Sequence, residues 1–136
     1  MANHGGGYQY RICKLPSDGI SGVTEECFQK TPLEFIGTER EVRPEFNATW
    51  TTEPVFQSNV GTWPKGSTWR KNHYFPPTND PPPGMMQKVK YIGRGQIKDK
   101  VKVPDVEAGT YVVSWRWDCE ASPQVWSGCA NVELVA

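Results

Sequence analysis

The strongest constraint on the fold is an alternation of apolar and polar residues in the last third of the chain. From 111 to 118, every odd position carries a large apolar or aromatic residue, and three of the four even positions are polar. Successive side chains of a strand point to opposite faces of a sheet, so this period indicates a half-buried strand. Four further stretches favour strands: 8–13, 49–56, 97–103 and 124–135.

Glycine and proline break up the chain between these strands. Together they occupy 25 of the 136 positions, as 13 glycines and 12 prolines, so turns are frequent and long helices are disfavoured. Residues 57–87 have the least regular pattern and are predicted to form a long loop, whereas residues 24–29 could form one helical turn. Short strands joined by such turns predict one all-β domain over residues 1–136, an antiparallel immunoglobulin- or fibronectin-III-like β-sandwich with long loops.

The charge and the hydropathy of the sequence limit the kinds of molecule that the chain is expected to bind. The chain has 15 basic and 15 acidic residues, so it lacks the excess of positive charge with which proteins bind nucleic acid or an anionic membrane surface. No stretch reaches the roughly 18 consecutive apolar residues that indicate a membrane span. A neutral polymer such as a polysaccharide is compatible with this balance.

Four cysteines indicate a secreted, extracellular protein: Cys13, Cys27, Cys119 and Cys129. Three connectivities are open, and four free thiols are the alternative. The simplest connectivity pairs Cys13 with Cys27 and Cys119 with Cys129, because a long gap separates the two pairs. The C-x-x-C and Cys/His pairs of zinc sites are absent from the sequence. Asn47 begins a glycosylation sequon, which fits a secreted protein.

Several segments carry a resemblance to a known family. They are a His-Gly-Gly-Gly start of a strand in residues 2–13, a Val-Pro-Asp turn before the long strand in 103–120, and a Gln-x-Trp motif before a cysteine in 123–132. In this order they resemble the lytic polysaccharide monooxygenase superfamily. Residues 61–72 are similar to chitin-binding type-4 proteins.

The resemblance implies a copper site. In this superfamily an N-terminal histidine and one internal histidine hold the copper, beside an axial aromatic or small apolar group and a second-sphere amide or carboxylate. Carried over to this sequence, His4 is the internal metal ligand, while Trp126 and Gln124 are the axial and second-sphere residues of the catalytic site. The resemblance further implies that these three residues lie together at one end of the sandwich. The expected substrate is a polysaccharide of the chitin or cellulose class.

The sequence departs from the family at two points. Trp126 stands where members carry tyrosine or phenylalanine, and an indole offers an N–H donor but no ligating oxygen. The family's leading strand and histidine have no counterpart before Met1, so the copper brace is incomplete and the domain is expected to be N-terminally truncated. We expect a monooxygenase-like protein that is inactive as this chain. An unpaired sheet edge near residues 1–12 would then favour self-association.

Structural alternatives stand beside these functional assignments. His4 could belong to a flexible glycine-rich start, and Gln124 and Trp126 could simply pack the end of the sandwich. The alternative function is a non-catalytic extracellular module that binds polysaccharide or assembles with other proteins. Trp63 and Trp69, in the loop-rich middle of the chain, are then the candidate glycan contacts.

Four other residues favour structural roles. Trp115 and Trp117 alternate with polar residues and are predicted to belong to the core. His73 is expected to be an exposed loop residue. Asp99 lies between two lysines and is interpreted as a solvated strand position.

Overall fold

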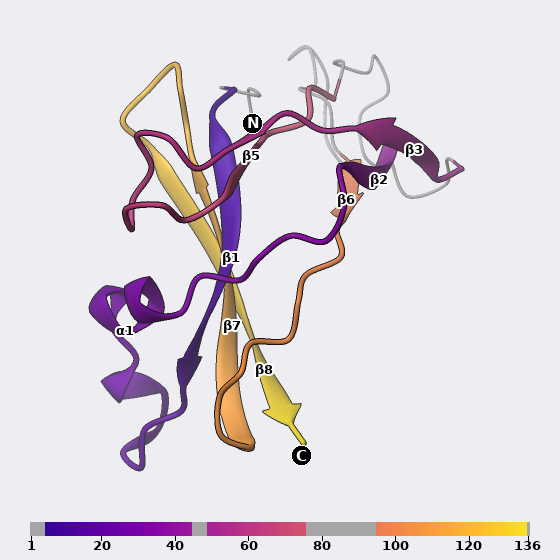
Figure 1. Ribbon diagram of the computed structural model, residues 1–136. Coiled ribbons are helices and arrows are strands. Elements are labelled where there is room, and N and C mark those ends of the chain that lie inside the picture. Colours follow the sequence, from indigo (N-terminus) through magenta and orange to yellow (C-terminus); the bar gives the residue numbers. More distant parts are fainter. Residues whose placement is uncertain (1–4, 45–48, 76–94, 136) are drawn as a thin grey trace, which may run out of the picture.

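The computed structural model describes residues 5–44, 49–75 and 95–135 (Figure 1). His4 and Asn47, the predicted copper ligand and glycosylation site, lie outside these ranges. Within them, no helix has the length and apolar character that crossing a membrane requires. The elements in chain order are β1 (Gly7–Lys14), η1 (Gly19–Gly22), α1 (Glu25–Lys30), β2 (Glu39–Pro44), β3 (Thr51–Pro54), β4 (Gln57–Ser58), β5 (Trp69–Lys71), β6 (Gly95–Lys98), β7 (Gly109–Asp118) and β8 (Val125–Leu134).

The main sheet has five antiparallel strands in the order β4-β5-β1-β7-β8. All eight residues of β1, its central strand, pair with β7. β7 pairs in turn with β8 over ten residues, from Gly109 opposite Leu134 to Asp118 opposite Val125. The strands predicted from alternation at the two ends of the chain are therefore confirmed, and so is the helical turn near residue 25.

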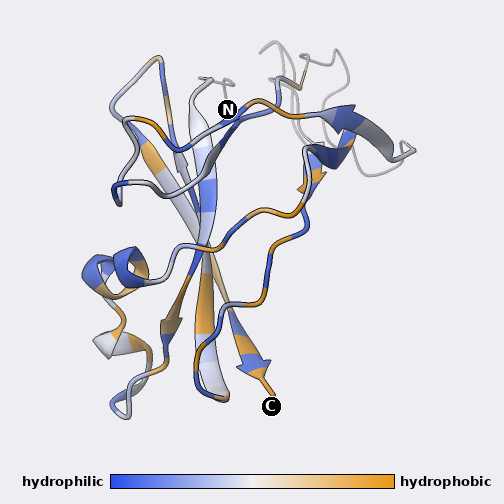
Figure 2. Cartoon of the chain, in the orientation of Figure 1, coloured by the Kyte–Doolittle hydropathy of each residue, from blue (hydrophilic) through white to orange (hydrophobic). Residues whose placement is uncertain are grey.

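The two faces of the main sheet bury separate apolar clusters. On one face, Ile12 and Tyr111 pack with Leu33. On the other face, Phe28 of α1 packs on Val112. Figure 2 shows hydrophobic colour on the lower parts of β1 and β7, where these clusters lie. Trp126 and Gln124, two of the candidate site residues, lie at the other end of the sheet, beside the β7–β8 turn.

A smaller antiparallel sheet, in the order β3-β2-β6, lies at the upper right of Figure 1. An isolated bridge between Phe35 and Val101 extends the same pairing toward the main sheet. The strand predicted over 97–103 is found only in part, because β6 ends at Lys98 and Val103 is 69% exposed. The described residues thus form an all-β fold of two antiparallel sheets.

The two edge strands of the main sheet are β4 and β8, and β8 is the longer of the two. One side of β1 pairs with β7, and its other side pairs with β5 and then with residues 31–33. There the amide of Ile12 donates to the carbonyl of Thr31 at 3.0 Å. The predicted open edge near residues 1–12 is therefore wrong for the described part of this segment. Among the described strands, β8 has β7 as its single neighbour.

One of the two predicted disulfides is present. Cys13 of β1 is bonded to Cys27 of α1, with Cα atoms 5.5 Å apart. A disulfide is compatible with an extracellular protein. The same helix is capped by Thr24, whose hydroxyl accepts from the amide of Cys27 at 3.2 Å.

The predicted bridge between Cys119 and Cys129 is wrong, since both thiols are free. The register of the β7–β8 hairpin explains this. The amide of Cys119 donates to the carbonyl of Gln124 at 3.0 Å, whereas Cys129 lies opposite Ser114. The position opposite Cys119 is thus five residues from Cys129 along the strand, or about 17 Å at roughly 3.4 Å per residue. A disulfide requires Cα atoms within about 7 Å.

Candidate functional site

The start of β1 is held against the turn that joins β7 and β8, at the upper end of Figure 1. The indole Nε1 of Trp117 donates to the carbonyl of Gly5 at 2.7 Å, and the amide of Gly6 donates to the carboxylate of Glu120 at 3.3 Å. Gly6 has a φ of +82°, and a Cβ there would lie 1.9 Å from the carbonyl oxygen of Asp118. A glycine at position 6 is therefore required for this close approach.

Trp126 and Gln124 belong to the same end of the sheet. Trp126 lies opposite Trp117 in the hairpin, so both indoles project from one face. Trp126 is half-buried, and its Nε1 has no hydrogen-bond partner. Gln124 is exposed in the turn just before β8. The described parts of three segments that carry the family resemblance thus meet at one end of the sheet.

The described side chains at this end do not fit a copper ion. No group of three His, Cys, Asp or Glu side chains within the described ranges could hold a metal. The groups beside Gly5 and Gly6 are the carboxylate of Glu120 and the indole of Trp117, and an indole N–H only donates. Copper in proteins favours imidazole and sulfur ligands. We therefore derive no reaction step through copper.

Of the predicted glycan contacts, Trp63 lies in the loop before β5, and Trp69 is the first residue of β5. Trp63 is 66% exposed. Trp69 is half-buried, and its Nε1 donates to the carbonyl of Trp63 and to the hydroxyl of Ser67, both at 3.2 Å. Ser67 also accepts from the side-chain amide of Gln9 in β1 at 3.2 Å. One indole is thus fixed against the sheet, while the other faces solvent and can stack on a flat apolar surface.

A shallow groove of about 220 Å³ adjoins this loop. Residues 64–68 line one side of the groove and residues 32–34 line the other. The lining combines the opposite charges of Lys65 and Glu34 with the hydroxyls of Ser67 and Thr68. Such a mixed lining suits a neutral, hydroxyl-rich ligand better than a strongly charged one.

A buried ion pair that was not recognised in the sequence joins the two sheets. Arg70 of β5 and Asp99 are paired at 2.6 Å, with side chains 0% and 1% exposed. Asp99 also accepts from the hydroxyls of Tyr8 and Tyr10, at 2.9 Å and 3.3 Å. The interpretation of Asp99 as a solvated strand position is therefore wrong. β6 ends one residue before it, but its side chain keeps the alternation of the segment and faces inward, like those of Ile97 and Val101.

The two tyrosines at this ion pair stay protonated. Burial raises the pKa of both Tyr8 and Tyr10 above the ordinary value, and the negative charge of Asp99 adds to the effect. Phe35 covers the cluster, with the guanidinium carbon of Arg70 4.3 Å from its ring centre. The carboxylate, the guanidinium and the two hydroxyls of this cluster all have hydrogen-bond partners within it. We therefore interpret the cluster as a structural link between the two sheets.

His73 is half-buried, so the prediction of an exposed loop residue is wrong. Its Nδ1 lies 2.8 Å from the carboxylate of Glu53, which also pairs with Arg40 at 2.7 Å. The imidazole packs edge-on against Phe75. Burial acts to raise the pKa of Glu53, but the hydrogen bonds from Arg40 and His73 outweigh it and hold that pKa below its usual value.

A second set of charges fixes α1 to the main sheet. Glu25 accepts from Arg11 of β1 at 2.5 Å and 2.7 Å, and from Arg116 of β7 at 2.5 Å. Arg116 also donates to Asp118 at 2.6 Å. Burial acts to raise the pKa of Glu25, but the hydrogen bonds and positive charges of the arginines hold it below its usual value.

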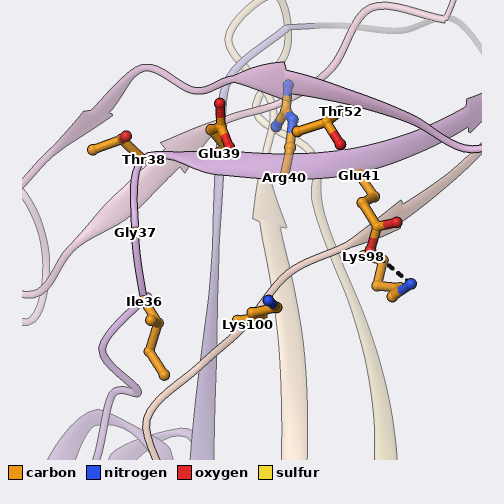
Figure 3. A pocket seen from close by; sticks show the side chains of 9 residues that line it. All are labelled: Ile36, Gly37, Thr38, Glu39, Arg40, Glu41, Thr52, Lys98 and Lys100. Carbon is orange, nitrogen blue, oxygen red and sulfur yellow. Dashed lines mark ion pairs between the residues drawn. The ribbon is translucent and has the colours of Figure 1, made fainter.

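A groove of about 450 Å³ lies beside the smaller sheet (Figure 3). Residues 36–41 line much of it. Figure 3 shows Glu41 and Lys98 pointing toward one another, and the two are paired at 2.6 Å. Arg40, also in the lining, is paired with Glu53. Most of the charge in this groove is neutralised within the protein, and we assign no chemistry to it.

Comparison of the chain with protein-family models, with curated proteins and with solved structures finds no match. The described residues define an all-β protein of two antiparallel sheets with one disulfide and an exposed tryptophan loop. Its function has to be inferred from its own residues and contacts.

Proposed function

We propose that this chain is a lytic polysaccharide monooxygenase-like β-sandwich that binds a polysaccharide of the chitin or cellulose class without oxidising it. The observation that carries the proposal is the contact between Gly5 and Trp117, which are 112 positions apart in the chain. It unites the start of β1 with the β7–β8 hairpin that bears Trp126. These are the segments through which the sequence resembles the superfamily, and no local pattern dictates that they meet.

An immunoglobulin- or fibronectin-III-like arrangement of the two sheets is part of the same proposal. In an immunoglobulin- or fibronectin-III-like sandwich, two antiparallel sheets face each other across an apolar core. The packing of Val101, which follows β6, against Ile12 and Tyr111 and the ion pair of Arg70 with Asp99 support such an arrangement. Secretion is also part of the proposal, and the bond between Cys13 and Cys27 supports it.

The binding role is supported by the loop of Trp63 and Trp69. An exposed indole on an anchored loop offers a flat apolar surface, and the adjoining groove offers hydroxyl and charged groups of both signs. The zero formal net charge of the chain suits a neutral polymer. The non-catalytic role is supported by the described side chains, among which no group of three His, Cys, Asp or Glu could hold a metal.

Depletion by insoluble polysaccharide tests the binding role. We expect chitin or cellulose to remove the protein from solution in a saturable manner, and Trp63→Ala to reduce this binding at least tenfold. Trp50→Ala is the matched control, since Trp50 lies on the smaller sheet under Arg43 and Lys98. Binding to neither polymer would contradict the proposal. So would equal losses in the two tryptophan variants when both remain folded.

A product assay tests the non-catalytic role. The protein is incubated with chitin or cellulose, a copper(II) salt, ascorbate and hydrogen peroxide, and soluble products are analysed by mass spectrometry. We expect no oxidised oligosaccharides above the level of a protein-free control. Oxidised products that disappear with His4→Ala would show that the chain is a monooxygenase and would overturn this part of the proposal.

A further inference from the structure

In the described ranges, no strand pairs with the outer side of β8. Among the described strands it pairs with β7 alone, and seven of its ten residues are exposed. Natural edge strands usually avoid pairing with other chains by carrying lysine, proline or a bulge, or by being short. β8 contains neither lysine nor proline, and its single charged residue, Glu133, lies near its end. The edge therefore lacks the usual protection.

Along an antiparallel strand, the backbone N–H and C=O groups of successive residues point alternately to the two neighbouring sides. The known hydrogen bonds therefore identify the residues whose backbone groups point to this open side. The amide of Cys119 donates to the carbonyl of Gln124, so the even-numbered residues of β8 direct their backbone groups at β7. On the other side of β7, the amide of Leu15 donates to the carbonyl of Thr110, so the even-numbered residues of β7 direct their backbone groups at β1. The odd-numbered residues of β7 therefore face β8, which agrees with the assignment for β8. The residues whose N–H and C=O face outward are Val125, Ser127, Cys129, Asn131 and Glu133.

We propose that two copies of the chain pair through their β8 edges, antiparallel and about a two-fold axis at Cys129. In a symmetric pairing, each residue lies opposite its mirror position along the strand. The register centred on Cys129 is the one that uses all five outward-facing residues of the strand. Any other symmetric register leaves at least one of them without a partner inside β8. This proposal does not depend on the proposed function.

The side chains are compatible with this register. Glu133 would lie opposite Val125 of the second copy, so no like charges face each other. Trp126 would lie opposite Val132, a combination of aromatic and β-branched residues that stabilises sheets. Each Cys129 would lie opposite its own copy with Cα atoms about 5.5 Å apart, because the pair is hydrogen-bonded. That separation falls within the range of a disulfide.

Thiol cross-linking tests the register. Oxidised glutathione accepts the two electrons when two Cys129 thiols join, giving one disulfide and two molecules of reduced glutathione. We expect a covalent dimer from Cys119→Ser and none from Cys129→Ser. The matched control adds Ser127→Cys to Cys129→Ser. This thiol is on the same face of the strand, but the proposed register separates the two copies of position 127 by about 13 Å.

Asn131→Pro tests the edge itself. Proline removes an outward-facing N–H but none of the bonds to β7, so the monomer fold should persist. We expect the wild-type protein to dimerise with rising concentration in analytical ultracentrifugation and Asn131→Pro to require at least tenfold higher concentration. A wild type that stays monomeric would overturn the proposal. Dimers unaffected by Asn131→Pro, or equal cross-linking at positions 127 and 129, would also overturn it.

Discussion

Arg70 and Asp99 form an ion pair that is sealed from solvent between the two sheets, with a separation of 2.6 Å between Nη1 and Oδ1. Arg70 also donates to the carbonyls of Gly37 and Glu39, which precede and begin β2. The guanidinium thus connects β5 of the main sheet to the segment that leads into β2 and to Asp99, which directly follows β6. Arg70 therefore joins the two sheets, as does Arg40 of β2, which donates to the hydroxyl of Tyr8 and to the carbonyl of Lys71.

Loss of the negative partner should destabilise the fold strongly. Asp99→Asn leaves the guanidinium of Arg70 buried without a counter-charge, which typically costs about 3–5 kcal/mol. The free energy of unfolding, measured by urea denaturation, should fall by that amount. Asp105→Asn makes the same change at an exposed carboxylate and should alter stability by less than about 0.5 kcal/mol. Similar losses in the two variants would contradict the structural role of the pair.

The close approach of β1 to the β7–β8 turn predicts a difference between two glycines. Gly6→Ala combines a strained positive φ with a clash against the carbonyl of Asp118. Gly61→Ala has a similar φ of +72°, but nothing lies within 4 Å of the added Cβ. The strain alone should cost roughly 1 kcal/mol, and Gly6→Ala should lose clearly more in thermal or urea unfolding. Equal losses would show that the approach is not tight.

The disulfide between Cys13 and Cys27 should contribute about 3 kcal/mol, the value typical of a loop of about 15 residues. A reducing agent is therefore expected to lower the stability of the wild type and to leave Cys27→Ala unchanged. Cys119→Ser serves as control because Cys119 is free, and its stability should respond to reduction as the wild type does. A wild type that is insensitive to reduction would contradict the bond.

Acid should weaken the attachment of α1. The folded-state pKa of Glu25 lies below its unfolded value because Arg11 and Arg116 outweigh the effect of burial. The unfolded state therefore binds more protons, and the stabilisation is present above the unfolded pKa and lost as the pH falls through the folded one. Urea denaturation between about pH 6 and pH 3 should show a steeper loss for wild type than for Glu25→Gln. Glu26→Gln, at an exposed neighbour, should retain the wild-type slope.

Local sequence pattern predicted the elements that depend on local periodicity. The alternation between 111 and 118 became β7, and the residues around Glu25 became the one α-helix of the described chain. Trp115 and Trp117 are half-buried on the same face, with ring centres 6.2 Å apart, so their predicted position in the core holds in part. These features follow from residues a few positions apart.

Contacts between distant residues could not be read from the pattern. Asp99 sits between lysines and looks solvated, and its burial is made favourable by distant residues, namely Arg70 and the hydroxyls of Tyr8 and Tyr10. The spacing of Cys119 and Cys129 suggests a local bridge, but it carries no information about the hairpin register that separates them. The resemblance predicts an open edge at the start of the chain because the family's leading strand has no counterpart, and local pattern does not reveal that residues 31–33 run beside β1.

The most direct measurement of polysaccharide binding uses the indole N–H signals of the six tryptophans as separate probes. Isotope-labelled protein is titrated with soluble N-acetylglucosamine and glucose hexasaccharides of the chitin and cellulose type, and the indole resonances are followed by NMR. We predict that the signals of Trp63 and Trp69 shift in a saturable manner with one of the two sugars, while that of Trp50 stays in place. Unchanged signals with both sugars, or shifts that spare Trp63 and Trp69, would contradict the proposed function.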